Sequence, residues 1–434
     1  MTETAERPDD AYQSPTLSCD LVMKGGIASG VVYPPAILKL ARTYRLRGIG
    51  GASAGAIAAA AAAAAEYGRH EPKAHAGFRG LEELRADLES GKRIQELFEP
   101  AKATAVLYRF LMDLQRHAAK DEPGAEPGPL VWLGRITWAL LARVPLWLCA
   151  GALVALGIVH LVMRPLAVLS AARLAPDAGS IGLALLVWAL AGASVYAGAL
   201  AAGVWRLKRG FDALCARDRT FFGFCLGSRG KDEEQPLRLT DWLHQGINRM
   251  AGYEAGKPPL TIDELAARSI DFRMVTTNLS HAQPVILPRK EGGLFFRRSD
   301  FERLFPPSVV AYLVHPESRE RSEDPPEVRD ARAREGILAG ERDHGLRLPE
   351  DYYPLPKGGC LPVIVAVRLS LSFPILLGQV RLYSLKASKR EEGKKRAGGD
   401  PIALTPADFE ENWFSDGGIA ANFPLSIFDR WMPD

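Results

Sequence analysis

Charged residues are distributed unevenly along this chain of 434 residues. Only six of the 76 residues from 131 to 206 are charged, although the share of 24% in the whole chain would give about eighteen. Two runs in this segment, 144–163 and 178–205, have no ionised side chain over 20 and 28 residues. About 20 apolar residues suffice to cross a bilayer as a helix. We therefore predict a transmembrane helical hairpin at 131–210, with spans at about 144–163 and 181–205.

Basic residues favour one orientation of this hairpin. Several flank the two runs on their outer sides, and few lie between them. The outer ones are Arg135, Arg143, Arg206, Lys208, Arg209, Arg217 and Arg219, and the inner ones are Arg164 and Arg173. Both long flanks are therefore expected in the cytoplasm. The alternative is a buried helical hairpin in a large soluble domain, which would need protein on all sides.

The remaining sequence has the pattern of a mixed α/β protein. Residues 20–67 alternate between strand-like and helix-like stretches separated by glycine turns, and 270–434 contains short apolar runs such as Phe272–Thr276 and Leu361–Leu369. Such alternation favours a mostly parallel central sheet covered by helices. We predict an α/β fold of three layers. The charge-rich stretches 315–350 and 386–400 are expected to be solvated loops, although the second could also contact anionic lipid headgroups.

Composition narrows the classes of function. Apolar residues make up 47% of the chain, which is typical of an ordered protein, and the net charge of +3 is too balanced for a main partner such as DNA. We expect no nucleic-acid partner. The five cysteines are scattered and form no C-x-x-C pair, so isolated thiols are expected rather than disulfides or zinc. The first twenty residues lack the apolar core of a secretory signal, so the N-terminus is expected to stay cytosolic.

Candidate chemistry is concentrated first at Gly50-Gly51-Ala52-Ser53-Ala54-Gly55, which contains G-x-S-x-G. It follows the expected strand Tyr44–Ile49 and precedes an alanine-rich run that should form a helix. A nucleophile elbow needs small residues around its serine because the backbone is strained and chains pass close together. The positive end of the helix dipole would then lie beside Ser53.

An upstream turn, Lys24-Gly25-Gly26-Ile27-Ala28-Ser29-Gly30, follows a short apolar strand. Its glycines would allow backbone N–H groups to converge on an anion, as an oxyanion hole or a phosphate cradle requires. The spacing matches neither a dinucleotide fingerprint nor a Walker loop. This turn could therefore be an anion site or simply a tight turn.

A third motif, Trp413-Phe414-Ser415-Asp416-Gly417-Gly418, offers a carboxylate before two glycines. No histidine follows Asp416, since the last one in the chain is His344, so a triad in the order serine, acid, histidine would need an earlier acid. We read the histidines as bystanders. A Ser–Asp dyad is chemically sufficient because a carboxylate within hydrogen-bond reach can accept the serine proton.

Taken in order, these motifs resemble the patatin-like phospholipases. That family has a glycine-rich oxyanion turn, then G-x-S-x-G, then Asp-Gly-Gly or Asp-Gly-Ala far downstream, and the segment Leu369–Pro374 is similar to the one that precedes its Asp-Gly element. The resemblance covers about 18–68 and 270–434. It implies Ser53 as nucleophile, Asp416 as base, and Gly25, Gly26 and Ile27 as oxyanion donors, with no metal or organic cofactor.

The chain also departs from the family pattern. The family turn is typically G-G-G-x-[RK]-G, whereas here Ile27 replaces a glycine and Ser29 the basic residue. We predict a disordered tail at 1–17 from its polar composition, and the resemblance implies a catalytic domain in two parts, 18–130 and 211–434, interrupted by the hairpin. The chain ends eighteen residues after Asp416, where we expect at least one more strand or helix.

The function implied is a membrane-bound serine acyl hydrolase that cleaves fatty-acyl esters of phospholipids or lysolipids in the bilayer, with its catalytic domain on the cytoplasmic side. Neutral lipids and thioesters remain open as substrates. The alternative is a catalytically silent membrane protein that binds lipid or docks a partner. A transporter is disfavoured, since two spans without an intramembrane acid or base make a poor pathway.

Overall fold

The computed structural model of the protein forms two compact units. The first unit comprises Met1–Glu99 and Thr220–Asp434, and the second comprises Pro100–Arg219. The residues that the structure describes are 10–26, 29–73, 75–89, 96–118, 129–141, 157, 178–232, 234–254, 256–314, 346–395 and 402–429.

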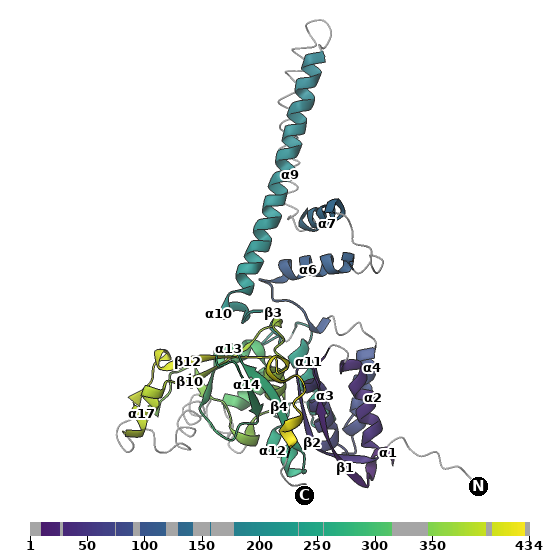
Figure 1. Cartoon of the computed structure of the whole chain (residues 1–434), viewed down its shortest axis with the longest axis vertical. Coiled ribbons are helices and arrows are strands. Elements are labelled where there is room, and N and C mark those ends of the chain that lie inside the picture. The colour runs from purple at the N-terminus through teal and green to yellow at the C-terminus, as the bar shows by residue number, and fades with distance from the viewer. Residues whose placement is uncertain are drawn as a thin grey trace, which may run out of the picture. The chain divides into compact units, whose positions relative to one another are not determined.

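An eight-stranded sheet forms the centre of the first unit (Figure 1). Its strands follow the order β1-β2-β4-β12-β10-β6-β8, and β5 pairs with β4. The bounds are β1 (Leu17–Met23), β2 (Tyr44–Ala52), β4 (Asp271–Asn278), β5 (Gln283–Leu287), β6 (Leu294–Arg297), β8 (Tyr352–Pro354), β10 (Val380–Leu385) and β12 (Phe409–Ser415). Two smaller sheets pair β3 (Gly223–Cys225) with β9 (Ile375–Leu377) and β7 (Leu346–Arg347) with β11 (Ile402–Ala403).

The predicted α/β class is confirmed, but the sheet is parallel only in part. β1, β2 and β4 are parallel neighbours, whereas every pairing from β4 through β12, β10 and β6 to β8 is antiparallel. The expectation of a mostly parallel sheet therefore holds only for the three strands that carry the nucleophile motif. β4 turns directly into the antiparallel β5, without the helical crossover that a parallel pairing would need.

Helices pack on one face of the parallel strands, and the short turn Leu425–Phe428 packs on the other. The first unit contains α1 (Asp10–Gln13), α2 (Ser29–Ala41), α3 (Ala54–Tyr67), α4 (Gly77–Glu89), α11 (Leu239–Met250), α12 (Ile262–Ala267), α13 (Arg298–Leu304), α14 (Pro307–Val314), α16 (Val363–Ser370), α17 (Ala387–Lys395) and α18 (Gly418–Ala421). α3 packs against β2, and α16 packs against β4. Ile427 packs with Ala52 and Val275 on the other face. This arrangement follows from the alternation of side chains along a strand.

One apolar stretch and one charged stretch form other elements than the sequence pattern predicts. The run at Leu361–Leu369, which the apolar pattern places among the sheet-forming segments, contains the buried helix α16, because it packs against α3, α11 and β4 on several sides. The segment 386–400, expected to be a loop, contains helix α17, in which Lys389 and Glu392 form an i,i+3 ion pair at 2.9 Å. Residues 315–345 of the other predicted loop lie outside the described part.

The N-terminal tail is also more structured than predicted. Residues 10–17 include helix α1 and the first residue of β1, since the Tyr12 ring is buried and stacks on Phe78 with centroids 5.2 Å apart. Residues 1–9 lie outside the described part.

The second unit contains α6 (Ala105–Ala118), α7 (Pro129–Leu141) and α9 (Ala178–Leu214), which pack pairwise. It extends beyond the predicted insertion at 131–210, because the amphipathic α6 packs with the two apolar helices. Helix α9 has 37 residues and is about 55 Å long at 1.5 Å per residue.

Among the described residues, one helix is long and apolar enough to cross a membrane. It is Leu186–Leu214 within α9, with mean hydropathy 1.6 and only 6% of its most apolar window buried. That low burial argues against the alternative of a buried hairpin in a soluble domain, since such a helix would be covered by protein. The second predicted span falls in α9, and the first, 144–163, lies outside the described residues except for Gly157.

One buried arginine joins the N-terminal elements of the first unit. Arg69 follows α3 and forms an ion pair with Glu66 at 2.5 Å. Its guanidinium also donates to the backbone carbonyls of Ala41, Tyr44 and Tyr12. The ends of α1, α2 and α3 and the start of β2 therefore depend on a single charged side chain.

We expect Arg69→Ala to lower the free energy of unfolding by about 3–5 kcal/mol, because it leaves Glu66 without its cation in a buried setting. Thermal or denaturant unfolding of the full chain in detergent measures this. Arg298→Ala is the matched control, since Arg298 pairs with Glu302 at 3.0 Å on the surface and such pairs contribute less than about 1 kcal/mol. Equal losses in the two variants would contradict the role assigned to Arg69.

Candidate active site

Ser53 lies on a sharp turn between β2, which ends at Ala52, and α3, which begins at Ala54. Its backbone has φ 57° and ψ −133°, a region that residues with a side chain rarely adopt. Such strain costs of order 1–3 kcal/mol and is concentrated at functional sites. The strand, turn and helix are those that the G-x-S-x-G pattern predicts.

The glycines of the motif are required by close backbone contacts. A Cβ added to Gly55 would lie 2.3 Å from the carbonyl oxygen of Met23 in β1, and one added to Gly51 would lie 2.8 Å from the carbonyl oxygen of Gly55. Both neighbours are main-chain atoms, which cannot swing away as a side chain would. Only glycine at these positions lets β1, β2 and α3 meet at the serine.

The end of α16 holds the turn from the side of β4. The Ser53 N–H donates to the hydroxyl of Ser370 at 3.2 Å, and that hydroxyl donates to the Val275 carbonyl at 2.5 Å. Two residues further, the Ser372 carbonyl accepts the Asp416 N–H at 3.0 Å. The segment Leu369–Pro374 therefore contacts both the nucleophile turn and the loop that carries the carboxylate.

Asp416 follows the last residue of β12 and is 3% exposed. Its Oδ1 accepts the Gly418 N–H at 2.7 Å, while its buried Oδ2 accepts no hydrogen bond from any described residue. Burial raises the pKa of the Asp416 carboxyl, and the neighbouring Ser53 hydroxyl and Gly418 N–H oppose that rise. Oδ2 is thus a carboxylate oxygen with free capacity to accept a proton.

The three predicted motifs meet at Ser53. A Cβ on Gly25 would lie 2.6 Å from Ser53 Cβ and 3.1 Å from its Oγ. A Cβ on Gly418 would lie 2.8 Å from Asp416 Oδ1 and 3.4 Å from Ser53 Cβ. The glycine turn and the Asp-Gly-Gly element therefore both lie next to the serine.

The glycine turn is not wholly free to bind an oxyanion. The Gly25 N–H donates to the Asn422 carbonyl at 3.1 Å and is already satisfied. The Gly26 N–H makes no hydrogen bond to a described residue, and Ile27 lies outside the described part. Of the three predicted donors, Gly26 is therefore the one among the described residues whose N–H group is available to an oxyanion.

Asn422 is a site residue that the sequence analysis missed. Its Oδ1 lies 2.5 Å from the Cβ position of Gly25 and 3.1 Å from that of Gly418, so its side chain lies beside the two glycines that adjoin Ser53. The only sequence signal is its place six residues after Asp416, before Phe423-Pro424, and that pattern alone is typical of many turns.

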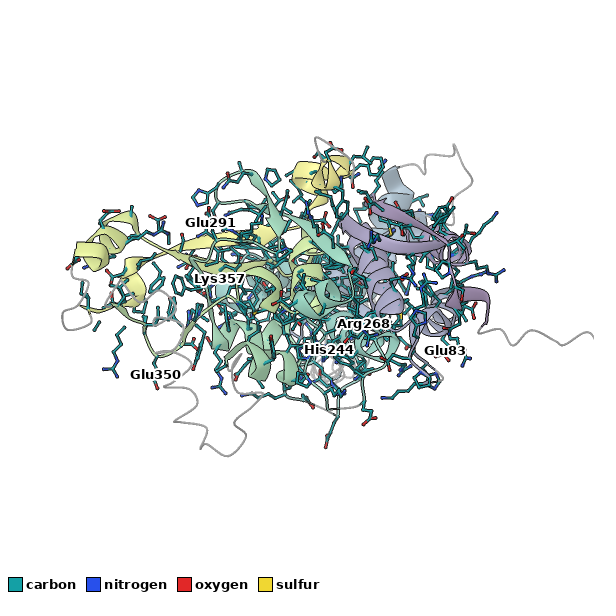
Figure 2. All side chains as sticks on the ribbon, turned by 90° about the horizontal axis from the view of Figure 1, so that it is seen from below. Glu83, His244, Arg268, Glu291, Glu350 and Lys357 are labelled. Atoms are coloured by element: carbon teal, nitrogen blue, oxygen red, sulfur yellow. The ribbon has the colours of Figure 1, made fainter. Side chains whose placement is uncertain are left out.

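Histidine chemistry is not arranged around Ser53. In the described part of the chain, no hydrogen bond joins a histidine to Ser53 or Asp416. His244, labelled in Figure 2, is buried on α11, and its Nε2 lies 3.1 Å from the Ser308 Oγ. Burial lowers the pKa of His244 to about 4, so this imidazole is neutral at pH 7.

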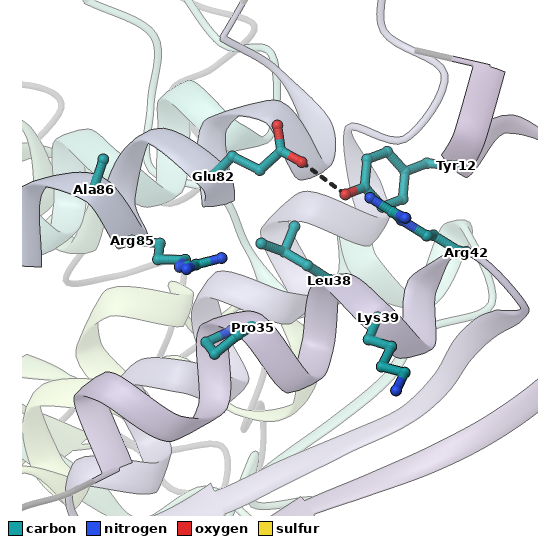
Figure 3. A pocket seen from close by; sticks show the side chains of 8 residues that line it. All are labelled: Tyr12, Pro35, Leu38, Lys39, Arg42, Glu82, Arg85 and Ala86. Carbon is teal, nitrogen blue, oxygen red and sulfur yellow. Dashed lines mark hydrogen bonds between the residues drawn. The ribbon is translucent and has the colours of Figure 1, made fainter. Parts of the chain in front are cut away.

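A separate cavity of about 570 Å³ lies between α2 and α4 (Figure 3). Tyr12 donates to Glu82 there at 2.8 Å, and Lys39, Arg42 and Arg85 contribute positive charge. None of these residues belongs to the three motifs. Among the described residues, no group of three His, Cys, Asp or Glu side chains could hold a metal ion.

Comparison with known proteins gives one relative. The chain is 34% identical, over 475 aligned residues, to a protein named RpoH suppressor from Rhizobium meliloti (strain 1021). The alignment covers 97% of this chain but only 65% of that relative, and the printed name assigns no chemistry to it. No protein-family model and no solved structure matches the chain.

We expect Gly55→Ala to destabilise the protein by about 1–3 kcal/mol, because the added methyl group overlaps the Met23 carbonyl oxygen. Gly246→Ala in α11 is the matched control. A Cβ there meets nothing within 4 Å, so removing a helical glycine should stabilise by about 0.5–1 kcal/mol. Thermal unfolding in detergent compares the two, and a stabilising Gly55→Ala would show that the backbones can separate.

Asp416→Asn is expected to stabilise the fold at pH 7. Burial raises the pKa of Asp416 above the ordinary 3.8 in the folded protein. The native state therefore loses stability as pH rises from 3.8 to the higher pKa of the folded state. The gain from Asp416→Asn should therefore be largest above that window and shrink toward pH 4. Unfolding measured from pH 4 to 8 tests this.

Asp408→Asn is the control of opposite sign. Hydrogen bonds from the Thr405 backbone and side chain lower the pKa of Asp408, so its contribution is present at neutral pH and lost as pH falls. If Asp416→Asn and Asp408→Asn changed stability with pH in the same direction, that result would contradict a raised pKa for the buried Asp416 carboxyl.

Proposed function

We propose that the protein is a membrane-bound serine acyl hydrolase of the patatin-like type, which cleaves fatty-acyl esters of phospholipids or lysolipids. The observation that carries this proposal is the contact between a strained serine and a buried carboxylate. Ser53 lies at φ 57° in front of α3, and Asp416 Oδ2 is buried beside it without a hydrogen-bond partner among the described residues. A nucleophile and a base in this relation need no histidine.

The reaction proceeds in two steps. The Ser53 Oγ attacks the ester carbonyl while Asp416 Oδ2 takes the hydroxyl proton, and the alcohol leaves with that proton as the C–O bond breaks. A water molecule then attacks the acyl-serine ester, giving its proton to Asp416. The fatty acid is released as the serine regains a proton. The raised pKa of Asp416 makes it a better proton acceptor than an ordinary carboxylate.

The negative charge on the tetrahedral intermediate needs hydrogen-bond donors. The Gly26 N–H and the first N–H group of α3, at Ala54, are the proposed donors, since the residue after the nucleophile commonly supplies one. The 14-residue α3 adds the positive end of its dipole at Ser53. Gly25 is assigned a steric role instead, because its N–H is bonded to Asn422.

A lipid substrate is supported by the rest of the chain. The apolar helix Leu186–Leu214 has exposed side chains along its length, including Leu190 and Trp205, as a helix in contact with lipid would. The basic residues that follow it favour a cytoplasmic catalytic unit. The second candidate is a silent member that keeps the fold to bind lipid or a partner, and the bonded Gly25 N–H is the observation that favours it.

Fluorophosphonate labelling of the full chain in bilayers, followed by release of free fatty acid from mixed phospholipids, tests the proposal. We expect Ser53→Ala to abolish labelling, and both Ser53→Ala and Asp416→Asn to reduce fatty-acid release by at least about 10³-fold. Ser308→Ala is the matched control, since Ser308 is exposed and hydrogen-bonded to His244, and it should retain both activities. Folded wild-type protein that neither labels nor releases fatty acid would favour the silent member.

A further inference from the structure

Five large apolar side chains lie exposed on the two loops that flank Asp416. We call them the apolar rim: Phe373 (54% exposed), Ile375 (59%), Ile419 (51%), Phe423 (50%) and Leu425 (56%). Single exposed apolar residues are common on soluble proteins. A group of five on adjacent loops calls for a partner that covers it.

Each part of the rim adjoins the candidate site along the chain. Ile419 follows Gly418, whose Cβ position is 3.4 Å from Ser53 Cβ, and Phe423 follows Asn422. Phe373 follows Ser372, which accepts the Asp416 N–H. The two loops are joined to each other by the Gly417 N–H, which donates to the Ser370 carbonyl at 3.0 Å. The rim therefore borders the region around Ser53.

Ile375 is held in a strained conformation. It has φ 69°, which is a true outlier for a β-branched residue, and it is the most exposed member of the rim. Its pairing with Gly223 in the β3–β9 sheet maintains this conformation. Such strain is concentrated at functional sites, and here it holds an apolar side chain exposed.

We propose that the apolar rim is a membrane-docking surface, which inserts into the lipid bilayer and brings the entrance to Ser53 against it. The inference rests on the proposed function, because a bilayer is then both the partner and the source of substrate. A bilayer is favoured over a protein partner because only eight residues, 215–222, separate the apolar helix α9 from β3, the strand paired with Ile375. The rim's aromatic and aliphatic side chains are those that enter the acyl boundary of a membrane.

The test replaces rim residues one at a time with the photo-crosslinker p-benzoylphenylalanine in the full chain carrying Ser53→Ala. The protein is reconstituted in vesicles of the dialkyl ether analogues of phosphatidylcholine and phosphatidylglycerol, which have no fatty-acyl ester to hydrolyse. Positions 373, 375 and 423 are compared with Leu17, which is 52% exposed at the start of β1, at the opposite end of the parallel strands from Ser53. Lipid adducts are counted by mass spectrometry after illumination.

We expect at least about fivefold more lipid adduct at each rim position than at Leu17. Lipid adducts no more frequent than at Leu17, or crosslinks to a second copy of the chain in place of lipid, would overturn the proposal. Matched thermal unfolding of every variant ensures that a misfolded protein is not scored. Because the readout uses an inactive serine variant and uncleavable lipid, it stands or falls separately from the hydrolase activity.

Discussion

The close approach of three backbones at Ser53 is the constraint on which the candidate site depends. β1, β2 and α3 meet there. Main-chain carbonyl groups occupy the space that a Cβ atom on Gly51 or Gly55 would need, so no larger residue fits at either position. That approach bends the chain into the strained turn and presents the serine at the start of α3. The hydroxyl of Ser370 then fixes the turn from a different part of the chain.

Electrostatics at the site works against stability. The Asp416 carboxylate is buried among loops, with one oxygen satisfied by a backbone N–H and the other left open. A fully satisfied carboxylate would fit the fold better but would be a poorer proton acceptor. Hydrogen bonds to the loop backbone offset this cost. The Ser370 and Ser372 carbonyls accept from loop N–H groups, and the Thr277 hydroxyl donates to the Asp416 carbonyl.

Short-range patterns predicted the elements around Ser53 well, and long-range contacts account for what they missed. The strand, turn and helix at Ser53 follow from local glycine spacing and an alanine run, whereas the approach of Asp416 was implied by the resemblance of the motifs to the patatin-like family. Asn422 could not be found this way, because its role arises from a contact with Gly25 across the chain. The helix at Val363–Ser370 was missed for a related reason, since a short buried apolar run is compatible with strand or helix until its neighbours are known.

The site is assembled from parts that are far apart in the order of synthesis. The bond from Ser53 to Ser370 spans 317 positions, and the whole second unit lies between them. A growing chain therefore makes its apolar helix α9 long before it can complete the nucleophile's surroundings with Asp416 and Asn422. If the protein hydrolyses lipids, this order keeps the nascent chain harmless to the membrane into which it is being inserted.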